Sequence, residues 1–325
     1  MSHPPSGHPI ALPLPSPADT ARLIARLRFR HLQLITSLAQ EGSLRAAAHT
    51  LNLTQPALSK ALSELEAAFG FALFTRSSRG LRPTAQGAVA ARGAAMLLTE
   101  LGHLHGEAAG AATASAVVRV GAPPFVAQGY LPDVLARLSG GIPSVRAHLL
   151  EERVPVLFDA LAQGQVDALV TSYPAQLLDT PGVLLQFEKL FDAGFVVIAP
   201  PTHPLARARK VSWQQLAKER WVMPARFSML RRVMDESFLR QALMPPEPVV
   251  ESTSPVTNVA MVAAGIGLSA APVDTARHAL ASGLVKAVRV TPALATSPVA
   301  LIWRADVANP RVALLREALG LMPQP

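Results

Sequence analysis

Cysteine is absent from this chain of 325 residues, and charged residues make up only 16% of it, whereas 50% of its residues are hydrophobic. The lack of cysteine excludes disulfides, thiolate metal sites and cysteine redox sensing. The chain also has no run of about 20 apolar residues, the length that a membrane-spanning helix needs, so we expect no membrane partner. Its apolar composition predicts a globular protein. At about 150 residues per domain, its length predicts two or three domains.

Motifs of catalysis and cofactor binding are missing as well. The sequence contains no Gly-x-Ser-x-Gly elbow, no phosphate-binding loop and no His-Glu-x-x-His pair. Gly265-Ile266-Gly267 lacks the third glycine of a dinucleotide-binding turn, and His103 and His105 would point apart on a helix, which makes them a poor metal pair. These absences predict no enzyme activity, no cofactor and no metal. A cytosolic enzyme that carries a helix-turn-helix is an alternative, but it would need a set of catalytic residues that we do not find in the sequence.

The first 27 residues contain six prolines and no lysine or arginine before Arg22. A secretory signal needs a basic start and an unbroken apolar core, and this segment has neither. We therefore expect residues 1–27 to form a disordered leader, and the protein to be cytoplasmic.

Positive charge is concentrated near the N-terminus. Residues 1–92 contain ten lysines and arginines but only four acidic residues, which accounts for six of the eight net positive charges. A basic surface is often only a solvated face. Where it coincides with a motif that reads a DNA groove, it predicts contact with phosphates.

Such a motif occupies residues 43–83, which read SLRAAAHTLNLTQPALSKALSELEAAFGFALFTRSSRGLRP. Two short helical patterns, separated by a tight turn at Asn52, are followed by two short strands. Ser43 and Thr54 suit the caps of the two helices, and Pro56 fits the first turn of the second helix, where its missing N–H costs nothing. The residues expected to face the core are Leu44, Ala47, Ala48 and Leu51 in the first helix and Leu58, Ala61, Leu62, Leu65 and Phe69 in the second.

The opposite face of the second helix presents short hydrogen-bonding side chains and one cation, which suit base edges and phosphates. This layout is that of a winged helix-turn-helix, which places its second helix in the major groove of DNA. We expect wing strands at 72–75 and 81–83 and a tip at 76–80 whose arginines grip phosphate or the minor groove. The candidate DNA-binding residues are Ser43, Thr54, Gln55, Pro56, Ser59, Lys60, Ser63, Arg76 and Arg79.

Two further helices are expected around this motif. One covers residues 27–40, and the residues near its buried side would be Phe29, Leu32, Ile35, Thr36 and Leu38. The other begins after Thr84 and runs to about Ala112, before a hinge at 114–115. Its apolar stripe suits pairing with a second copy of the chain, and packing against the chain's own C-terminal domain is the alternative. The candidate dimerisation residues are Val89, Met96, Leu97, Leu101 and Leu104.

From Val117 on, strands alternate with helices, which is typical of doubly wound α/β units. The first unit is expected to have strands at 117–121, 145–151 and 166–172 and helices at 131–138 and 155–163. A second unit would have strands at 194–200, 249–252 and 267–271 and helices at 226–241 and 255–264. A strand at 299–304 and a helix at 311–319 would return to the first unit.

The run AAAHTLNLTQPALSKALSELEAAFGFALFTRSSRGLRPTAQG resembles the N-terminal domain of LysR-type transcriptional regulators. In that family an alanine pair precedes the turn, and a hydroxyl-Gln-Pro-Ala-x-Ser-basic run opens the recognition helix. A Leu-Phe-x-Arg wing and a Thr-x-x-Gly start of the next helix complete the pattern. Phrases of the same family recur at 130–132, 164–168, 199–206 and 262–268, so the resemblance covers roughly residues 28–320.

The resemblance implies a winged helix-turn-helix over residues 28–83, a linker and dimerisation helix over 84–114, and an α/β effector domain over 115–325. The effector domain would resemble type 2 periplasmic binding proteins, with lobe I at about 117–191 and 295–322 and lobe II at about 192–294. The implied function is sequence-specific regulation of transcription by a homodimer or homotetramer on double-stranded DNA. A small-molecule effector would alter DNA bending and contact with RNA polymerase. The alternative is a cytosolic solute-binding sensor that does not itself regulate through DNA.

Strand ends and helix starts predict an effector cleft between the two lobes. Arg226 would supply a cation and Phe227 an aromatic wall, so an anionic effector such as a carboxylate fits best. Each candidate could instead serve only as a cap, a turn or a solvated residue, and two prolines stand where the family generally offers a hydroxyl residue. The candidate effector-binding residues are Pro123, Pro124, Thr171, Ser172, Arg226, Phe227, Thr253 and Ser254.

Overall fold

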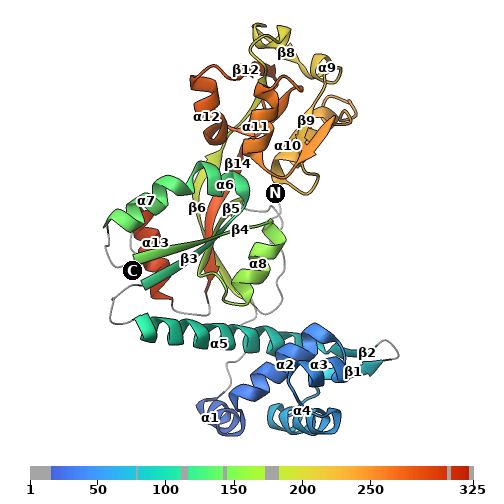
Figure 1. Cartoon of the computed structure of the whole chain (residues 1–325), viewed down its shortest axis with the longest axis vertical. Coiled ribbons are helices and arrows are strands. Elements are labelled where there is room, and N and C mark those ends of the chain that lie inside the picture. Colours follow the sequence, from blue (N-terminus) through green and yellow to red (C-terminus); the bar gives the residue numbers. More distant parts are fainter. Residues whose placement is uncertain are drawn as a thin grey trace, which may run out of the picture. The chain divides into compact units, whose positions relative to one another are not determined.

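The structure is a computed structural model that describes residues 16–77, 80–110, 116–141, 145–172, 183–305 and 309–321. The chain divides into two compact units, Met1–Leu98 and Thr99–Pro325, and each is described by itself. The long helix α5 (Ala85–Gly110) begins in the first unit and ends in the second (Figure 1).

Within its described residues, the first unit contains four helices, a two-stranded wing and the first half of α5. Its elements are α1 (Pro17–Arg26), α2 (Phe29–Glu41), α3 (Leu44–Thr50), α4 (Gln55–Phe69), β1 (Phe74–Ser77) and β2 (Gly80–Pro83). Ser43 and Thr54 cap α3 and α4, since their hydroxyl oxygens accept the N–H groups of Ala46 and Ala57. Asn52 lies in the turn between these helices with φ of 52°, the left-handed region that asparagine tolerates. The expected helix-turn-helix is therefore confirmed.

Three expectations for this unit differ from the structure. Residues 17–26 are helical rather than disordered, because Ser16 caps α1 by accepting the N–H of Asp19; residues 1–15 lie outside the described residues. Phe29 is 59% exposed, since it starts α2 and projects beyond the buried side that Leu32, Ile35 and Leu38 form. Strands β1 and β2 pair from Phe74↔Pro83 to Ser77↔Gly80, so β1 lies closer to the tip than the expected strand at 72–75, and Arg76 lies within a strand.

The start of α5 is packed directly on the wing. The hydroxyl of Thr84 donates to the carbonyl oxygens of Ala72 and Leu73 and accepts the N–H of Gly87 at 2.9 Å. A Cβ atom at Gly87 would lie 1.8 Å from the carbonyl oxygen of Leu73, a distance no side chain can adopt. The Thr-x-x-Gly motif of the sequence therefore has a steric cause: only glycine lets the helix approach this backbone.

We expect Gly87→Ala to destabilise the first unit by about 1–3 kcal/mol, because the added methyl forces the helix off the wing. Gly93→Ala is the matched control: it lies in the same helix with no atom within 4 Å of its added Cβ. That change should stabilise the protein by about 0.5–1 kcal/mol through helix propensity. Chemical denaturation followed by circular dichroism measures both, and equal effects of the two variants would contradict the steric account.

Lobe I of the second unit is built on a five-stranded sheet of order β4-β3-β5-β14-β6. Strands β3 (Ala116–Ala122), β4 (Val145–Glu151) and β5 (Ala168–Ser172) are parallel, whereas β14 (Ser297–Arg304) runs antiparallel to both β5 and β6 (Leu185–Ala193). The helices of this lobe are α6 (Pro124–Gly129), α7 (Leu131–Gly141), α8 (Val154–Ala162) and α13 (Pro310–Ala318). The expected return of the chain at 299–304 is confirmed.

Lobe II lies above lobe I in Figure 1 and contains smaller sheets. Strands β11 (Ser269–Pro272) and β12 (Lys286–Val288) both pair antiparallel with β7 (Phe195–Ala199). Strands β9 (Val222–Pro224) and β10 (Val250–Ser252) are parallel, as are β8 (Val211–Ser212) and β13 (Val290–Thr291). The helices are η2 (Pro204–Ala206), α9 (Trp213–Leu216), α10 (Met229–Leu239), α11 (Pro255–Ala263) and α12 (Val273–Ala281).

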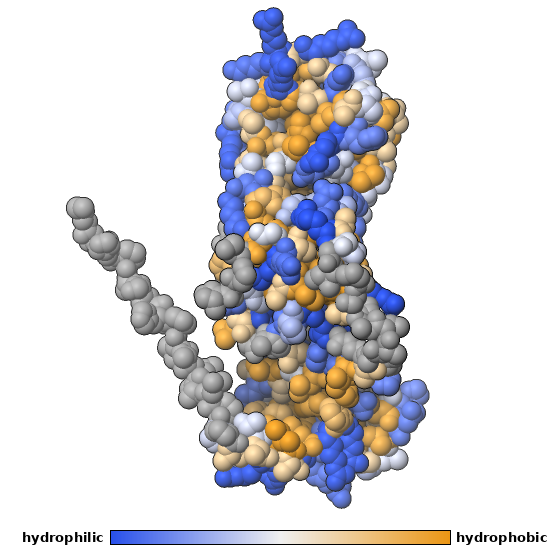
Figure 2. All heavy atoms as spheres, turned by 90° about the vertical axis from the view of Figure 1, so that its left-hand side faces the viewer, coloured by the Kyte–Doolittle hydropathy of each residue, from blue (hydrophilic) through white to orange (hydrophobic). Residues whose placement is uncertain are grey.

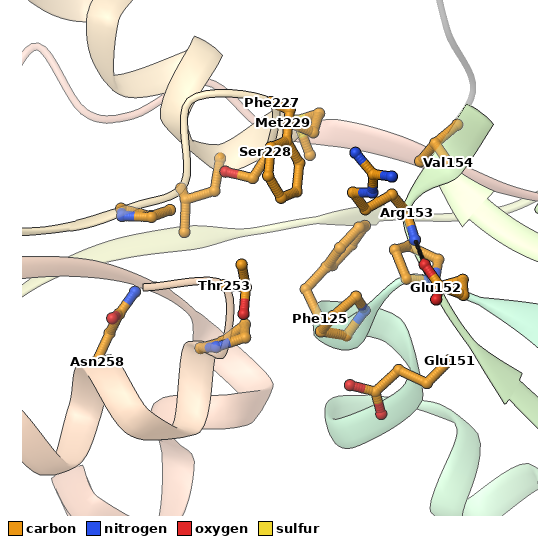
Figure 3. Close-up of a pocket in the computed structure, with 15 residues that line it drawn as sticks. Phe125, Glu151, Glu152, Arg153, Val154, Phe227, Ser228, Met229, Thr253 and Asn258 are labelled. Atoms are coloured by element: carbon orange, nitrogen blue, oxygen red, sulfur yellow. Dashed lines mark hydrogen bonds between the residues drawn. The ribbon is translucent and has the colours of Figure 1, made fainter. Parts of the chain in front are cut away.

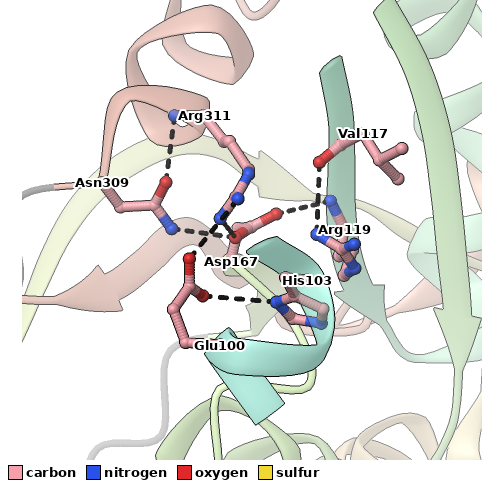
Figure 4. Close-up of polar contacts among 7 residues, drawn as sticks. All are labelled: Glu100, His103, Val117, Arg119, Asp167, Asn309 and Arg311. Carbon is pink, nitrogen blue, oxygen red and sulfur yellow. Dashed lines mark hydrogen bonds and ion pairs between the residues drawn. The ribbon is translucent and has the colours of Figure 1, made fainter. Parts of the chain in front are cut away.

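A buried carboxylate joins several elements of lobe I to the end of α5 (Figure 4). Asp167 accepts hydrogen bonds from the backbone N–H of Arg119 at 2.7 Å and from the side-chain amide of Asn309 at 2.8 Å. Arg311, at the start of α13, lies 3.4 Å from Asp167 and 3.5 Å from Glu100 of α5. Glu100 also lies 3.3 Å from His103, so this histidine has a carboxylate partner.

Candidate functional site

The exposed face of α4 carries the polar side chains that the sequence analysis assigned to DNA. Gln55, Pro56, Lys60 and Ser63 are exposed and Ser59 is half-buried. On the opposite face, Leu58, Leu62 and Leu65 are buried in the core of the unit. The packing of these leucines in the core therefore orients the polar side of the helix toward solvent.

The wing is fixed to α4 by two side chains. Glu66 accepts the backbone N–H groups of Leu73 and Phe74 at 2.7 and 3.1 Å, which anchors the chain just before and at the start of β1. Arg76 donates to the hydroxyl of Ser59 at 3.4 Å, so a wing arginine lies beside the polar face of α4. Glu66 was not among the predicted residues, because the N–H groups that donate to it lie on a later segment of chain. Arg79 lies outside the described residues.

The two capping hydroxyls each keep a hydrogen-bond donor. Ser43 and Thr54 each use one oxygen lone pair on a backbone N–H of their own helix. A hydroxyl that accepts a hydrogen bond still has its O–H to donate. Both can therefore cap a helix and donate to a phosphate oxygen at the same time.

Apolar side chains of α5 remain exposed in the single chain. Val89, Leu97, Leu101 and Leu104 are exposed, and Met96 is partly buried. Hydrophobic residues gather on the face shown in Figure 2 at the height at which Figure 1 shows α5. An apolar stripe left in water on a long helix favours a partner for that stripe.

A pocket of about 440 Å³ lies between the two lobes of the second unit (Figure 3). Lobe I contributes the loops at the carboxyl ends of β3 and β4, and lobe II contributes the starts of α10 and α11. Most of the lining is apolar, and the volume falls within the usual range for small-molecule sites. The lining residues are Pro123, Pro124, Phe125, Glu151, Glu152, Arg153, Val154, Pro224, Phe227, Ser228, Met229, Leu230, Thr253, Pro255 and Asn258.

Two polar features of the pocket stand out. The guanidinium of Arg153, from lobe I, lies 5.3 Å from the ring centre of Phe227, from lobe II, a cation–π contact between the lobes. Asn258 is only 1% exposed, its side chain points toward the pocket, and its Oδ1 has no hydrogen-bond partner among the described residues. A buried amide oxygen without a partner is costly, so it marks a place for a hydrogen-bond donor of a ligand.

The two carboxylates of the pocket already have donors. Glu151 accepts the side-chain amide of Gln128 at 3.1 Å, and Glu152 accepts the backbone N–H of Arg153 at 3.1 Å. Both belong to lobe I. Among the described lining residues of lobe II there is no acidic side chain.

The structure brings together half of the predicted effector residues. Pro123, Pro124, Phe227 and Thr253 line the pocket, whereas the other four do not. Arg226 is 69% exposed and lies 3.7 Å from Glu247 and 3.9 Å from Glu251, so these acids hold it outside the pocket.

The remaining three candidates do not line the pocket and have roles in the fold instead. Thr171 and Ser172 are buried in β5, paired with β14, and Ser254 caps α11 by accepting the N–H of Thr257. The cation of the pocket is therefore Arg153. It could have been found in the sequence, since Arg153 and Pro155 mark a helix start just as Ser254 and Pro255 do.

Two family models match the chain. The bacterial regulatory helix-turn-helix protein model of the lysR family matches residues 29–88, and the LysR substrate binding domain model matches residues 111–321. The chain therefore belongs to the LysR family.

Relatives and solved structures agree with this assignment. The transcriptional regulator GbpR of Azospirillum brasilense is 30% identical over 74% of this chain and 70% of its own length. The transcriptional activator LysR of Escherichia coli is 27% identical over 81% of this chain and 83% of its own length. Full-length OxyR of Pseudomonas aeruginosa superposes with a TM-score of 0.61 at 26% identity, covering 91% of this chain and 95% of its own.

A structure of CbnR complexed with its target DNA has the same fold, with a TM-score of 0.50 at 18% identity, covering 90% of this chain and 99% of that one. The protein is thus a DNA-binding transcriptional regulator with a ligand-binding α/β domain. In the described part of the chain, no helix is long and apolar enough to cross a membrane.

Proposed function

We propose that this regulator reads DNA with α4 and the wing, dimerises along α5, and changes its DNA contacts when an anionic small molecule occupies the interlobe pocket. We further propose that it acts in the cytoplasm, as a homodimer or as a tetramer formed from two dimers, and through contact with RNA polymerase. The observation that carries the effector part is the guanidinium of Arg153 at the pocket wall, 5.3 Å from the ring centre of Phe227 in the other lobe.

The DNA part rests on the geometry of α4. Gln55, Lys60 and Ser63 are exposed on its polar face, and the guanidinium of Arg76 lies 3.4 Å from the hydroxyl of Ser59 at the border of that face. Short side chains such as Gln55 and Ser59 suit hydrogen bonds to bases, whereas Lys60 and Arg76 suit phosphates.

Ser59→Ala and Arg76→Ala should therefore have different effects on DNA binding. Ser59→Ala should reduce discrimination between a selected operator and random DNA by about 1–3 kcal/mol. Arg76→Ala should weaken both DNAs alike and lower the slope of log affinity against log salt by about 0.9. Fluorescence anisotropy over a salt series measures both, with the exposed Lys286→Ala of lobe II as the control for loss of one charge. Unchanged binding of both variants at matched salt would refute this placement.

The assembly part rests on the exposed stripe of α5. Leu101→Asp would place a charge in the seam between two copies, where it would lose water without gaining a partner. We expect sedimentation to show dissociation and operator affinity to fall, because a single winged domain contacts only one half-site. The control is His105→Asp on the same helix. A sedimentation profile unchanged by Leu101→Asp, with DNA binding retained, would show that α5 packs elsewhere.

The anionic character of the effector follows from the balance of charges around the pocket. The starts of α8, α10 and α11 all contribute lining residues, and each helix has nine or more residues. Each helix start contributes about half a positive charge. Arg153 adds a full charge, so these groups offset the two carboxylates of lobe I, which already have donors.

The distribution of these groups also positions the ligand. The lobe II side combines the hydroxyl of Thr253, the side-chain NH2 group of Asn258 and two helix starts, with no acid among its described lining residues. An anionic group fits there, and the apolar part of the ligand fits between Phe125, Leu230 and Phe227. Arg153 lies over Phe227 and can reach the same group (Figure 3).

Thermal-shift screening of small carboxylic acids and amines should identify an acid, since a ligand of the native state raises the melting temperature. Arg153→Ala should then weaken that acid about ten- to a hundredfold, by loss of a charge-assisted hydrogen bond. Arg226→Ala is the matched control and should leave affinity nearly unchanged. An amine as the true ligand, or an acid that responds to Arg226→Ala but not to Arg153→Ala, would overturn this assignment.

A further inference from the structure

Helix α1 lies outside the residues matched by the family's helix-turn-helix model, which begin at residue 29. It is nevertheless a well-formed helix: Ser16 caps it, Asp19 lies in its first turn and Arg26 in its last, which suits the helix dipole. Leu23 is partly buried and Leu27 packs against the core of the first unit. The chain therefore holds α1 against the DNA-binding unit instead of leaving it in solvent.

The neighbour of α1 is the recognition helix. α1 contacts α4, and Figure 1 shows both helices along the edge of the first unit that is opposite to α5. Packed helices lie about 8–10 Å apart. The major groove is about 12 Å wide, so a helix placed beside the one in the groove lies over the phosphates at the border of that groove.

The charges of α1 fit such a position. Arg22 and Arg26 are exposed and four residues apart, so they share one face of the helix. Arg28 and Arg30 follow, both exposed, and no acidic residue occurs between Asp19 and Glu41. Arg22 has only a weak surface contact with Asp19 at 3.9 Å, and Arg26 forms no ion pair with any described residue.

The surroundings of His31, at the start of α2, report the same positive field. Burial is the main cause that lowers the pKa of His31, and the nearby Arg30 and Arg28 lower it further, against a smaller opposing effect of Glu64. The surface formed by α1 and the start of α2 thus repels a cation and suits a polyanion.

We propose that α1 is an accessory DNA-contacting helix, whose Arg22 and Arg26 bind the phosphate backbone flanking the groove occupied by α4. This inference rests on the DNA-binding function and adds to it a contact surface beyond the winged domain. The contact is with phosphates, so it strengthens binding without selecting a sequence.

The test is the double variant Arg22→Ala/Arg26→Ala in the full-length chain, because alanine keeps the helix while removing both charges. Affinity for selected operator and for random DNA should fall by the same factor. The slope of log affinity against log salt should become shallower by about 0.9 for each lost phosphate contact, up to about 1.8. Arg22→Lys/Arg26→Lys should keep the parent slope.

The control is Arg207→Ala/Arg209→Ala, which removes the same charge from exposed positions of lobe II and should leave the slope unchanged. Arg76→Ala in the same series separates the two proposals: if it flattens the slope and the α1 variant does not, the wing contact stands and the α1 contact is wrong. A change of sedimentation coefficient in the α1 double variant would also overturn the proposal, since it would assign α1 to an interface between copies.

Discussion

The ligand-binding unit depends on one buried carboxylate, Asp167. It accepts hydrogen bonds from two segments far apart in the sequence, namely β3 through Arg119, and the start of α13 through Asn309 and Arg311. The backbone N–H of Asp167 in turn donates to the carbonyl of Arg119, so the two residues fix the parallel register of β3 and β5. Burying the charge of Asp167 without these donors would cost several kcal/mol of folding free energy. Removal of any one donor is therefore expected to destabilise the lobe.

That register has consequences at both ends of the lobe. At the carboxyl ends of β3 and β4 it places Phe125 and Arg153 on the same edge of the sheet, where they form the lobe I wall of the pocket. At the other end, Arg311 lies between Asp167 and Glu100 of α5. The same polar cluster therefore supports the pocket and attaches the last turns of the helix that continues into the DNA-binding unit.

The DNA-binding unit was largely predictable because its signals are local. Caps at Ser43 and Thr54, the turn at Asn52 and the spacing of leucines each act within a few residues, and the structure confirms all of them. The errors arose where contacts beyond the nearest residues decide the outcome. Phe29 has a hydrophobic side chain but starts its helix outside the core, and Glu66 has partners seven and eight residues away on the wing.

The effector domain was predictable as a series of strands and helices, but not as a site. Strand β6 was not expected, since it owes its existence to pairing with β14 more than 100 residues later. Arg226 and Arg153 look alike in the sequence, as arginines at helix starts. What separates them is the pair of acids, Glu247 and Glu251, that lies beside Arg226 but not beside Arg153, and this follows only from the tertiary fold.

The contact of Arg153 with Phe227 limits what kind of ligand could act as an effector. A cation–π pair is worth about 0.5–2 kcal/mol, and a charge-assisted hydrogen bond to an anion about 1.5–3 kcal/mol, so exchanging one for the other gains only about 1 kcal/mol. Moving a two-state equilibrium from 1:99 to 99:1 requires about 5.5 kcal/mol of differential binding. A small inorganic anion could therefore occupy the pocket without switching the protein.

The remaining roughly 4.5 kcal/mol has to come from apolar surface that is buried in one lobe arrangement and exposed in the other. At about 25 cal/mol per Å², this corresponds to roughly 180 Å² of apolar area, about that of one aromatic side chain. The pocket provides such a wall in Phe125, Leu230 and Phe227, on both sides of the interlobe gap. The proposed effector is therefore a carboxylate with a sizeable apolar body, whose charge would position it at Arg153 while its apolar body would supply the energy of the switch.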